Sequence, residues 1–221
     1  MKIKFLSLIL FVCIFLSFGC KKESKNNSDD TEVQEVSYPT YMQLENGHYW
    51  VYERFNIDTN GQATALGIFD SCYIEKDTTI NGILYHKYVK PHLFSSHMIV
   101  SFIRDSLHYI VNHEGGIIFS SEDFTTIFES QHYLVGTDTM YVMILQMTDK
   151  NMQVATPAGQ YMTSNFRQKY IMYPGWDNNG NPRYMHTRYA KDIGVVIETL
   201  PFYMNNPNYT ERRLVRYNVS L

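Results

Sequence analysis

Three histidines that lie close together, His86, His92 and His97, are the first residues that could bind a metal. Their spacings of six and five residues match no compact zinc pattern, and the sequence contains no HExxH motif. His86 lies on the polar side of an alternating segment, and His92 and His97 flank a predicted loop. We therefore expect ordinary, partly exposed histidines here and no metal site.

Two acidic loops could bind calcium, and scattered acids could catalyse hydrolysis. Residues 58–61 (DTNG) and 177–180 (DNNG) lack the further spaced carboxylates and the terminal Glu of a calcium loop, so they are predicted to be turns. The sequence shows neither a nucleophile elbow nor a phosphate-binding loop. A dispersed hydrolase site would need titratable groups that converge in one cleft, and the candidates for it are Glu53, His86, His108 and Glu198. We expect no cofactor and no enzymatic activity, with the dispersed hydrolase as the least favoured alternative.

The chemistry of Cys20 is the best defined in the sequence. Lys2 and Lys4 precede an apolar run from Phe5 to Phe18, and Gly19 stands directly before the cysteine. This order is typical of an export signal, and the apolar run is shorter than the roughly 20 residues of a membrane-spanning helix. Because a cysteine follows the small residue, the segment resembles a bacterial lipobox, which implies cleavage before Cys20 and acylation of Cys20. The alternative is an uncleaved N-terminal membrane helix.

The chain is predicted to have three parts: a signal peptide over residues 1–19, a flexible polar tether over 20–37, and one β-rich domain over 38–221. Removing the signal takes two of the 19 basic residues and none of the 22 acidic ones, which leaves a net charge of −5. This balance argues against a nucleic-acid partner. We expect attachment to the bacterial envelope through the lipid, at the outer membrane, and the sequence leaves open whether the domain faces the periplasm or the cell exterior.

Apolar residues alternate with polar ones along most of the chain after Gly47, as in an antiparallel sheet with one face on a core. In three segments the apolar side, predicted to face the core, consists of Ile83, Tyr85 and Val89, then Leu107, Tyr109 and Val111, then Tyr209, Val215 and Tyr217. The opposite side, predicted to be wet, carries residues such as Lys90, His108 and Arg212. Residues 140–145 (MYVMIL) are apolar on both sides and predict a central strand that is covered on both faces.

Turn signals and one possible helix complete the prediction. Reversals are expected at Asn60-Gly61, Asn81-Gly82, Gly115-Gly116, Asn179-Gly180 and Pro157-Ala158-Gly159. Ser121 could cap a short helix that contains Phe124, Ile127 and Phe128. Cys72 lies in a predicted strand and is expected to be a buried, inert thiol. The fold class is therefore mainly β: a single antiparallel curved sheet, as a half-barrel or a sandwich, with at most one or two short helices.

Three short segments resemble a group of uncharacterised Bacteroidetes-type lipoproteins: residues 41–52 (YMQLENGHYWVY), 156–161 (TPAGQY) and 189–196 (YAKDIGVV). These segments are spread over the chain that follows the signal. The resemblance implies a curved antiparallel sheet similar to periplasmic lipoprotein-carrier folds, whose concave face packs against helices or accommodates acyl chains. No catalytic residue belongs to these segments, so none is transferred.

Two aromatic loops are the best candidates for binding. One contains Tyr173 and Trp176, and the other contains Phe202 and Tyr203. Aromatic side chains on loops can stack on sugars or anchor a partner, although packing back onto the end of the sheet is favoured. The sequence therefore predicts a noncatalytic binding or structural module for an apolar ligand or an envelope protein partner, and a glycan-binding module that uses these loops is the main alternative.

Overall fold

Alternating side chains and glycine-bearing turns produce a single antiparallel sheet in this protein. The computed structural model describes residues 36–92, 95–178, 180–200 and 208–220, and residues 37–221 belong to one compact unit. The described residues contain no helix that is long and apolar enough to cross a membrane. Their strands are β1 (Tyr49–Ile57), β2 (Ala63–Ile80), β3 (Ile83–Pro91), β4 (Met98–Ser106), β5 (Tyr109–Asn112), β6 (Ile117–Ser120), β7 (Glu129–Val135), β8 (Asp138–Thr156), β9 (Gly159–Met172), β10 (Arg183–Ala190), β11 (Gly194–Thr199) and β12 (Tyr209–Asn218).

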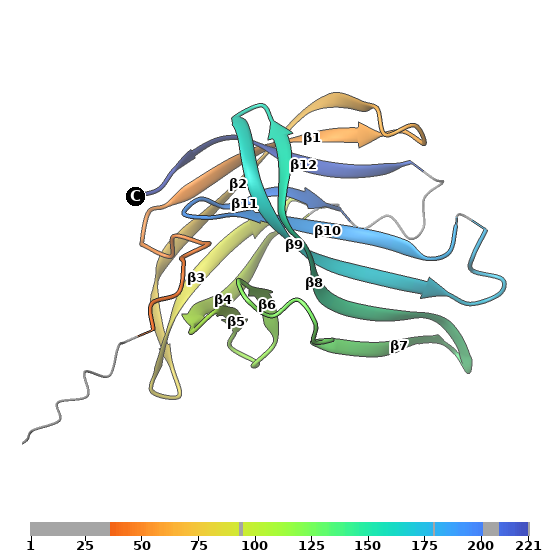
Figure 1. Cartoon of the computed structure of the whole chain (residues 1–221), viewed down its shortest axis with the longest axis horizontal. Coiled ribbons are helices and arrows are strands. Elements are labelled where there is room, and N and C mark those ends of the chain that lie inside the picture. The colour runs from red at the N-terminus through yellow and green to blue at the C-terminus, as the bar shows by residue number, and fades with distance from the viewer. Residues whose placement is uncertain (1–35, 93–94, 179, 201–207, 221) are drawn as a thin grey trace, which may run out of the picture. The chain divides into compact units, whose positions relative to one another are not determined.

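The strand order shows two meanders that join at the centre of the sheet. The order is β6-β5-β4-β3-β2-β1-β12-β11-β10-β9-β8-β7, so β1 pairs with β12 and the edges are β6 and β7. The sheet curls strongly enough for β6 to contact β9 (Figure 1). The result is a half-barrel built from one sheet, which confirms the fold class that the sequence predicts.

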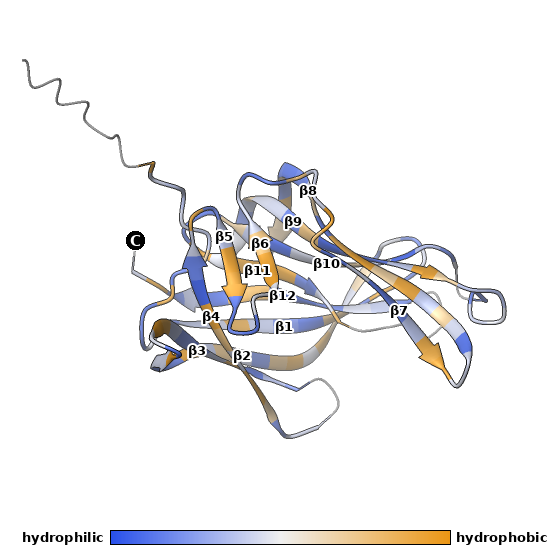
Figure 2. Cartoon of the chain, turned by 90° about the horizontal axis from the view of Figure 1, so that it is seen from below, coloured by the Kyte–Doolittle hydropathy of each residue, from blue (hydrophilic) through white to orange (hydrophobic). Residues whose placement is uncertain are grey.

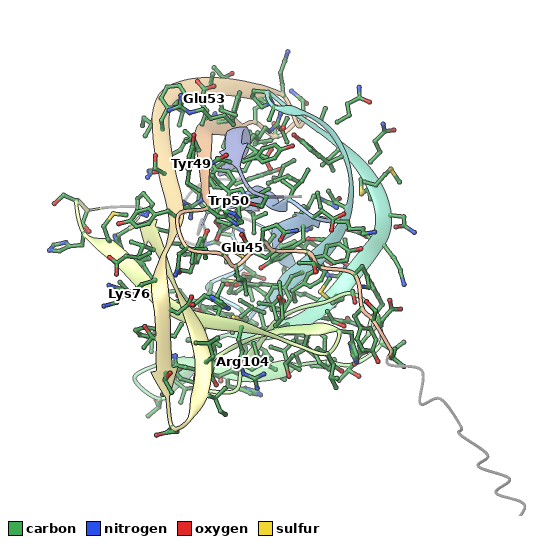
Figure 3. All side chains as sticks on the ribbon, turned by 90° about the vertical axis from the view of Figure 1, so that its left-hand side faces the viewer. Glu45, Tyr49, Trp50, Glu53, Lys76 and Arg104 are labelled. Atoms are coloured by element: carbon green, nitrogen blue, oxygen red, sulfur yellow. The ribbon has the colours of Figure 1, made fainter. Side chains whose placement is uncertain are left out.

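Two aromatic side chains of β1 point into the half-barrel and bond to the β10–β11 hairpin. Trp50 is completely buried, and its indole Nε1 donates a hydrogen bond to the carbonyl of Ile193 at 2.6 Å. The Tyr52 hydroxyl donates to the carbonyl of Val195 at 2.9 Å. Seen along the strands, the sheet surrounds a filled interior that contains Trp50 (Figure 3). The segment that leads to β1 adds two buried side chains, Met42 and Leu44, to the same core.

The β8–β9 hairpin bends across the sheet and packs over β12 (Figure 1). Its bend coincides with a register shift between Thr148 and Met152, where Asp149 and Asn151 adopt positive φ angles of 51° and 60°. At the tip, the amide of Ala158 donates to the carbonyl of Leu214 at 3.0 Å. The hairpin therefore closes part of the interior without becoming a neighbour of β12 in the sheet.

The turn predictions agree with the structure wherever it describes them. Residues 59–60, 81–82, 113–114 and 157–158 form turns between strands, and the hydrophobic stretches lie mainly along the strands rather than in the reversals (Figure 2). Of the Asn179-Gly180 pair, Asn179 lies outside the described residues. Cys72 is a free cysteine, and it is buried as predicted.

The predicted core side was wrong for parts of three segments. In β12, Arg212 and Leu214 are the buried residues, with 1% and 0% of their surface exposed. In the 107–112 segment, Ile110 is in the core, whereas Leu107 is 75% exposed in a turn. Tyr85 and Val89 of β3 are buried as predicted, but Lys90 on the opposite side faces the interior rather than solvent. The alternation was predicted correctly. The side that faces the interior was not, because the interior contains charged side chains and part of the outer face of the sheet is buried.

The predicted helix at Ser121 is also wrong. The hydroxyl of Ser120 accepts hydrogen bonds from the backbone amides of Glu122 and Asp123. The Asp123 carboxylate accepts hydrogen bonds from the backbone amides of Thr125 and Thr126. These side-chain acceptors compete with the hydrogen bonds of a helix. Residues 121–128 therefore form an extended connection from β6 to β7.

Residues 140–145 were predicted to form a central strand covered on both faces, and this was wrong. They belong to β8, which lies next to the sheet edge that β7 forms. Only Tyr141 among them is fully buried. Apolar side chains occur on both faces here because one face contacts the interior while the other stays half-exposed.

Gly194 should be intolerant of a side chain because it supports Trp50. Its φ is +111°, and an added Cβ would lie 3.2 Å from Trp50 Nε1. We expect Gly194→Ala to lower the free energy of unfolding by about 2 to 4 kcal/mol, through backbone strain and displacement of the indole. Gly61→Ala is the control, since Gly61 has a φ of +78° with no atom within 4 Å of an added Cβ, and it should cost about 1 kcal/mol. Equal losses for the two variants in urea denaturation would show that Trp50 does not depend on Gly194.

Candidate binding cavity inside the half-barrel

The curled sheet forms two adjoining cavities on its inner side, both partly open to solvent. The smaller, of about 180 Å³, has mostly apolar walls, formed by residues such as Met42, Ile103, Ile118, Phe166 and Val195. The larger, of about 420 Å³, has walls that are about half polar, and its lining includes the tyrosines and methionines Tyr133, Tyr141, Met143, Tyr170 and Met185. Strands β3 and β4 supply one side of the larger cavity, and strands β7 to β12 supply the rest. Only the curling of the sheet brings these strands together.

A polar belt separates the two cavities. Lys90, Gln168, Thr187 and Glu198 line both of them. The hydroxyl of Tyr170 donates to Gln168 Oε1 at 2.7 Å, which leaves the Gln168 amide nitrogen as a donor. The cavities therefore form one elongated interior site with apolar ends and a polar middle.

The register of the sheet explains how the belt is positioned. Directly paired residues of neighbouring strands point to the same face. Thr187 pairs with Glu198, Glu198 with Arg212, and Arg212 with Arg54. This row crosses β10, β11, β12 and β1 on the inner face, so it places an acid next to two arginines in the middle of the half-barrel.

Buried ion pairs link this row to both halves of the sheet. Arg212 contacts Glu198 at 2.8 Å and Asp70 at 3.5 Å. Asp70 also accepts two hydrogen bonds of 2.8 Å from the Arg54 guanidinium, from Nε and Nη2. Glu198 in turn lies 3.1 Å from the amine of Lys90. Each acid is therefore held by two cations, as a buried carboxylate requires.

The protonation state of Glu198 follows from these contacts. Burial alone would raise the pKa of its carboxyl, but the charges and hydrogen bonds of Lys90 and Arg212 outweigh burial and lower the pKa to about 2. Cys72, 4.0 Å from Arg212, behaves in the opposite way, because burial raises the pKa of its thiol to about 11. The interior thus contains an ionised carboxylate and a neutral thiol at pH 7.

A second polar cluster lies at β8, β9 and β10, away from the cavity lining. The Asn165 side-chain nitrogen lies 2.9 Å from both Asp149 Oδ2 and His186 Nδ1. Burial, followed by the charge of Arg188, lowers the pKa of His186 to about 4, so its ring is neutral at pH 7. A neutral Nδ1 can accept the Asn165 amide hydrogen. We interpret this cluster as packing at the bend of the hairpin.

The structure does not bring the predicted binding residues into this cavity. Tyr173 and Trp176 lie on the β9–β10 connection, where they are 39% and 37% exposed, and neither lines the two cavities. Phe202 and Tyr203 lie outside the described residues, as does Cys20. The roles predicted for these residues therefore stay predictions.

The four candidates for a dispersed hydrolase site do not meet in one cleft. His86 bonds to Asp77 at 2.9 Å, and His108 bonds to Ser120 at 3.0 Å. Only Glu198 of the four candidates lines the cavities, since Glu53, His86 and His108 are absent from their walls. Within the described ranges, no group of three His, Cys, Asp or Glu side chains could hold a metal ion.

Sequence reasoning missed the interior roles of Lys90, Gln168, Thr187 and Arg212. No local motif links them, because they come from β3, β9, β10 and β12. The one available signal was that Arg212 lies on the same side of its strand as the apolar Leu214, two residues later. Detecting the site would have required the register of the whole sheet.

Comparison with known proteins shows similarity in fold only. No family model and no curated protein matches the chain. A crystal structure from Bacteroides fragilis, described as an exported protein with a YmcC-like fold, aligns with 82% of this chain and 100% of its own, at a TM-score of 0.44 and 11% identity. A lipoprotein structure from Parabacteroides distasonis aligns with 83% of this chain and 100% of its own, at a TM-score of 0.42 and 12% identity.

Removing Arg212 should be far more damaging than removing Arg216 of the same strand. Arg212→Met leaves the buried Asp70 and the half-buried Glu198 with one cation each, and we expect a loss of about 3 kcal/mol or more in the free energy of unfolding. Arg216, which is exposed, is the control, and Arg216→Met should cost about 0.5 kcal/mol or less. Urea denaturation measures both. Similar small losses would mean that the buried ion pairs do not hold the half-barrel together.

Proposed function

We propose that this chain is an exported, lipid-anchored protein of the bacterial envelope, whose folded part is a noncatalytic module that binds an apolar or amphiphilic ligand inside the half-barrel. The proposed anchor is acylated Cys20 at the outer membrane, followed by the polar segment up to residue 37. The export signal and the lipobox-like sequence support this location. The binding role is supported by the interior of the domain.

The larger cavity is the observation that carries the proposed binding role. Its volume of about 420 Å³ falls within the roughly 300–1,000 Å³ of small-molecule sites. Its walls combine aromatic rings and flexible methionine side chains with a few polar groups, and methionine adapts its shape to irregular apolar ligands. The smaller apolar cavity beyond the polar belt offers space for an extension of the same ligand.

The charge state of the interior favours binding over catalysis. A general acid or base works best with a pKa near the operating pH. Glu198 is the acid that lines both cavities, and two cations lower the pKa of its carboxyl to about 2. Such a carboxylate stays ionised at neutral pH and is a poor proton carrier. It is better suited to fixing the neighbouring cations in place.

A second candidate function uses the outside of the molecule. Tyr173 and Trp176 are both more than one-third exposed on one loop, as a platform for a glycan or an envelope protein would require. This observation favours a surface site that is separate from the cavity. The cavity remains the stronger proposal because it combines volume, apolar walls and polar groups in one place.

An uncharged apolar fluorophore, N-phenyl-1-naphthylamine, tests the cavity directly. We expect saturable binding to the protein, and Met185→Trp should weaken it by about tenfold or more, because the larger side chain occupies the cavity that Met185 lines. The emission of the fluorophore, excited outside the tryptophan absorption band, measures binding, and circular dichroism checks the fold.

Two variants serve as controls for this experiment. Met162→Trp introduces the same side chain at a position that is 55% exposed, and Trp176→Ala removes the loop aromatic. Neither should change binding of the fluorophore. The absence of saturable binding to the wild-type protein would refute the cavity proposal, and so would equal effects of Met185→Trp and Met162→Trp. Loss of binding in Trp176→Ala alone would favour the loop instead.

A further inference from the structure

The charged side chains at and beside the polar belt carry more positive than negative charge. Among the described residues that line the larger cavity, Lys90 and Arg212 are cationic and Glu198 is the acid. Behind them, Asp70 is shared between Arg212 and the bidentate Arg54 contact. The whole network of three cations and two acids therefore has an excess of one positive charge. An excess charge in a buried site is costly unless an opposite charge joins it.

One buried donor beside the belt, Nε of Arg212, has no hydrogen-bond partner among the described residues. Arg212 lines the larger cavity and is 1% exposed. Buried polar groups in folded proteins are almost always satisfied. The guanidinium of Arg212 and the ammonium of Lys90, which both contact Glu198, form a pair of cationic donors for an oxyanion.

The walls on both sides of these donors include apolar side chains. Ile103, Ile118 and Phe166 lie in the smaller cavity, and Met143 and Met185 lie in the larger one. A small hydrophilic anion would satisfy the donors but leave these walls uncovered. A neutral apolar molecule would cover the walls but leave the positive charge and the donors unsatisfied. A ligand with one anionic end and one apolar chain satisfies both.

We propose that the interior site binds a single-chain amphiphile whose head is an oxyanion with one negative charge, held by Lys90 and Arg212. The chain of the ligand lies along the apolar walls of the cavities. This inference rests on the proposed function, because it specifies the chemistry of the ligand for the same cavity. The volumes of about 180 and 420 Å³ favour one chain rather than a lipid with several.

Displacement of N-phenyl-1-naphthylamine by three matched compounds tests the head group. Decanoate has the chain and the charge, 1-decanol has the chain alone, and acetate has the charge alone. At about pH 8, where a carboxylic acid is ionised, decanoate should displace the fluorophore at a concentration roughly tenfold lower than 1-decanol. Acetate should not displace it.

Two lysines of β3 provide a matched pair of variants. Lys90→Met keeps the aliphatic stem and removes the charge of Lys90 from the cavity. It should therefore weaken the binding of decanoate by about tenfold and leave the binding of 1-decanol unchanged. Lys87→Met is the control: its side chain is 23% exposed, against 25% for Lys90, but it pairs with Glu75 and lines neither cavity. It should behave as the wild-type protein.

The outcomes separate this inference from the proposed function. Equal displacement by decanoate and 1-decanol, with the fluorophore still bound by the wild-type protein, overturns the oxyanion head while the apolar cavity stands. If acetate displaces the fluorophore at the same concentration as decanoate, the ligand is a small anion and the proposal of an amphiphile is wrong. A uniform loss of all binding in Lys90→Met also overturns the inference, because it shows that Lys90 acts through the structure. Failure of the wild-type protein to bind the fluorophore contradicts the proposed function itself.

Discussion

The guanidinium of Arg212 is the contact on which the arrangement of this protein depends. It is almost completely buried on β12, at the junction of the two meanders. One nitrogen faces Asp70 of the first meander, and another faces Glu198 of the second. Because a buried carboxylate that loses its cation is strongly destabilised, this side chain constrains how β2, β12 and β11 can lie relative to one another. It also belongs to a charged network in the interior, together with Arg54, Asp70, Lys90 and Glu198.

The shape of the interior follows from the way the sheet is closed. Trp50 and Tyr52 bond to carbonyls at Ile193 and Val195, so the inner face of β1 is held to the β10–β11 hairpin across the sheet. The bent β8–β9 hairpin reaches β12 through Ala158. These contacts fill one part of the half-barrel with packed side chains. The smaller cavity is lined by residues of this core, the larger cavity lies beside strands β7 and β8, and the polar belt connects the two.

Much of the architecture could be predicted from local sequence. The period of two, the Asn-Gly turns and the Pro157–Gly159 reversal depend on the preferences of neighbouring residues, and they led to the correct fold class. The orientation of individual strands could not be predicted in the same way. Arg212 and Lys90 appeared to be solvent-facing because charged residues usually are, whereas ion pairs with residues distant in sequence bury them here.

The candidate site was hidden from the sequence for the same reason. Its polar belt combines single residues of β3, β9, β10 and β11, with Arg212 of β12 beside them. Because each comes from a different strand, no short sequence motif contains two of them. The failed helix at Ser121 shows a second limit of sequence patterns. A serine and an aspartate at suitable spacing can start a helix or cap an irregular connection, and the need to join β6 to β7 at opposite edges of the sheet decided between the two.

Methyl resonances of the methionines give the most direct test of the central claim that the interior cavity is the binding site. In protein labelled with ¹³C at the methionine methyl groups, titration with N-phenyl-1-naphthylamine should shift the signals of Met42, Met143 and Met185, which line the cavities. The signals of Met98, Met152 and Met162, which are 45%, 47% and 55% exposed, should stay in place. Shifts confined to the exposed methionines, with the three cavity signals unmoved at saturation, would contradict the account.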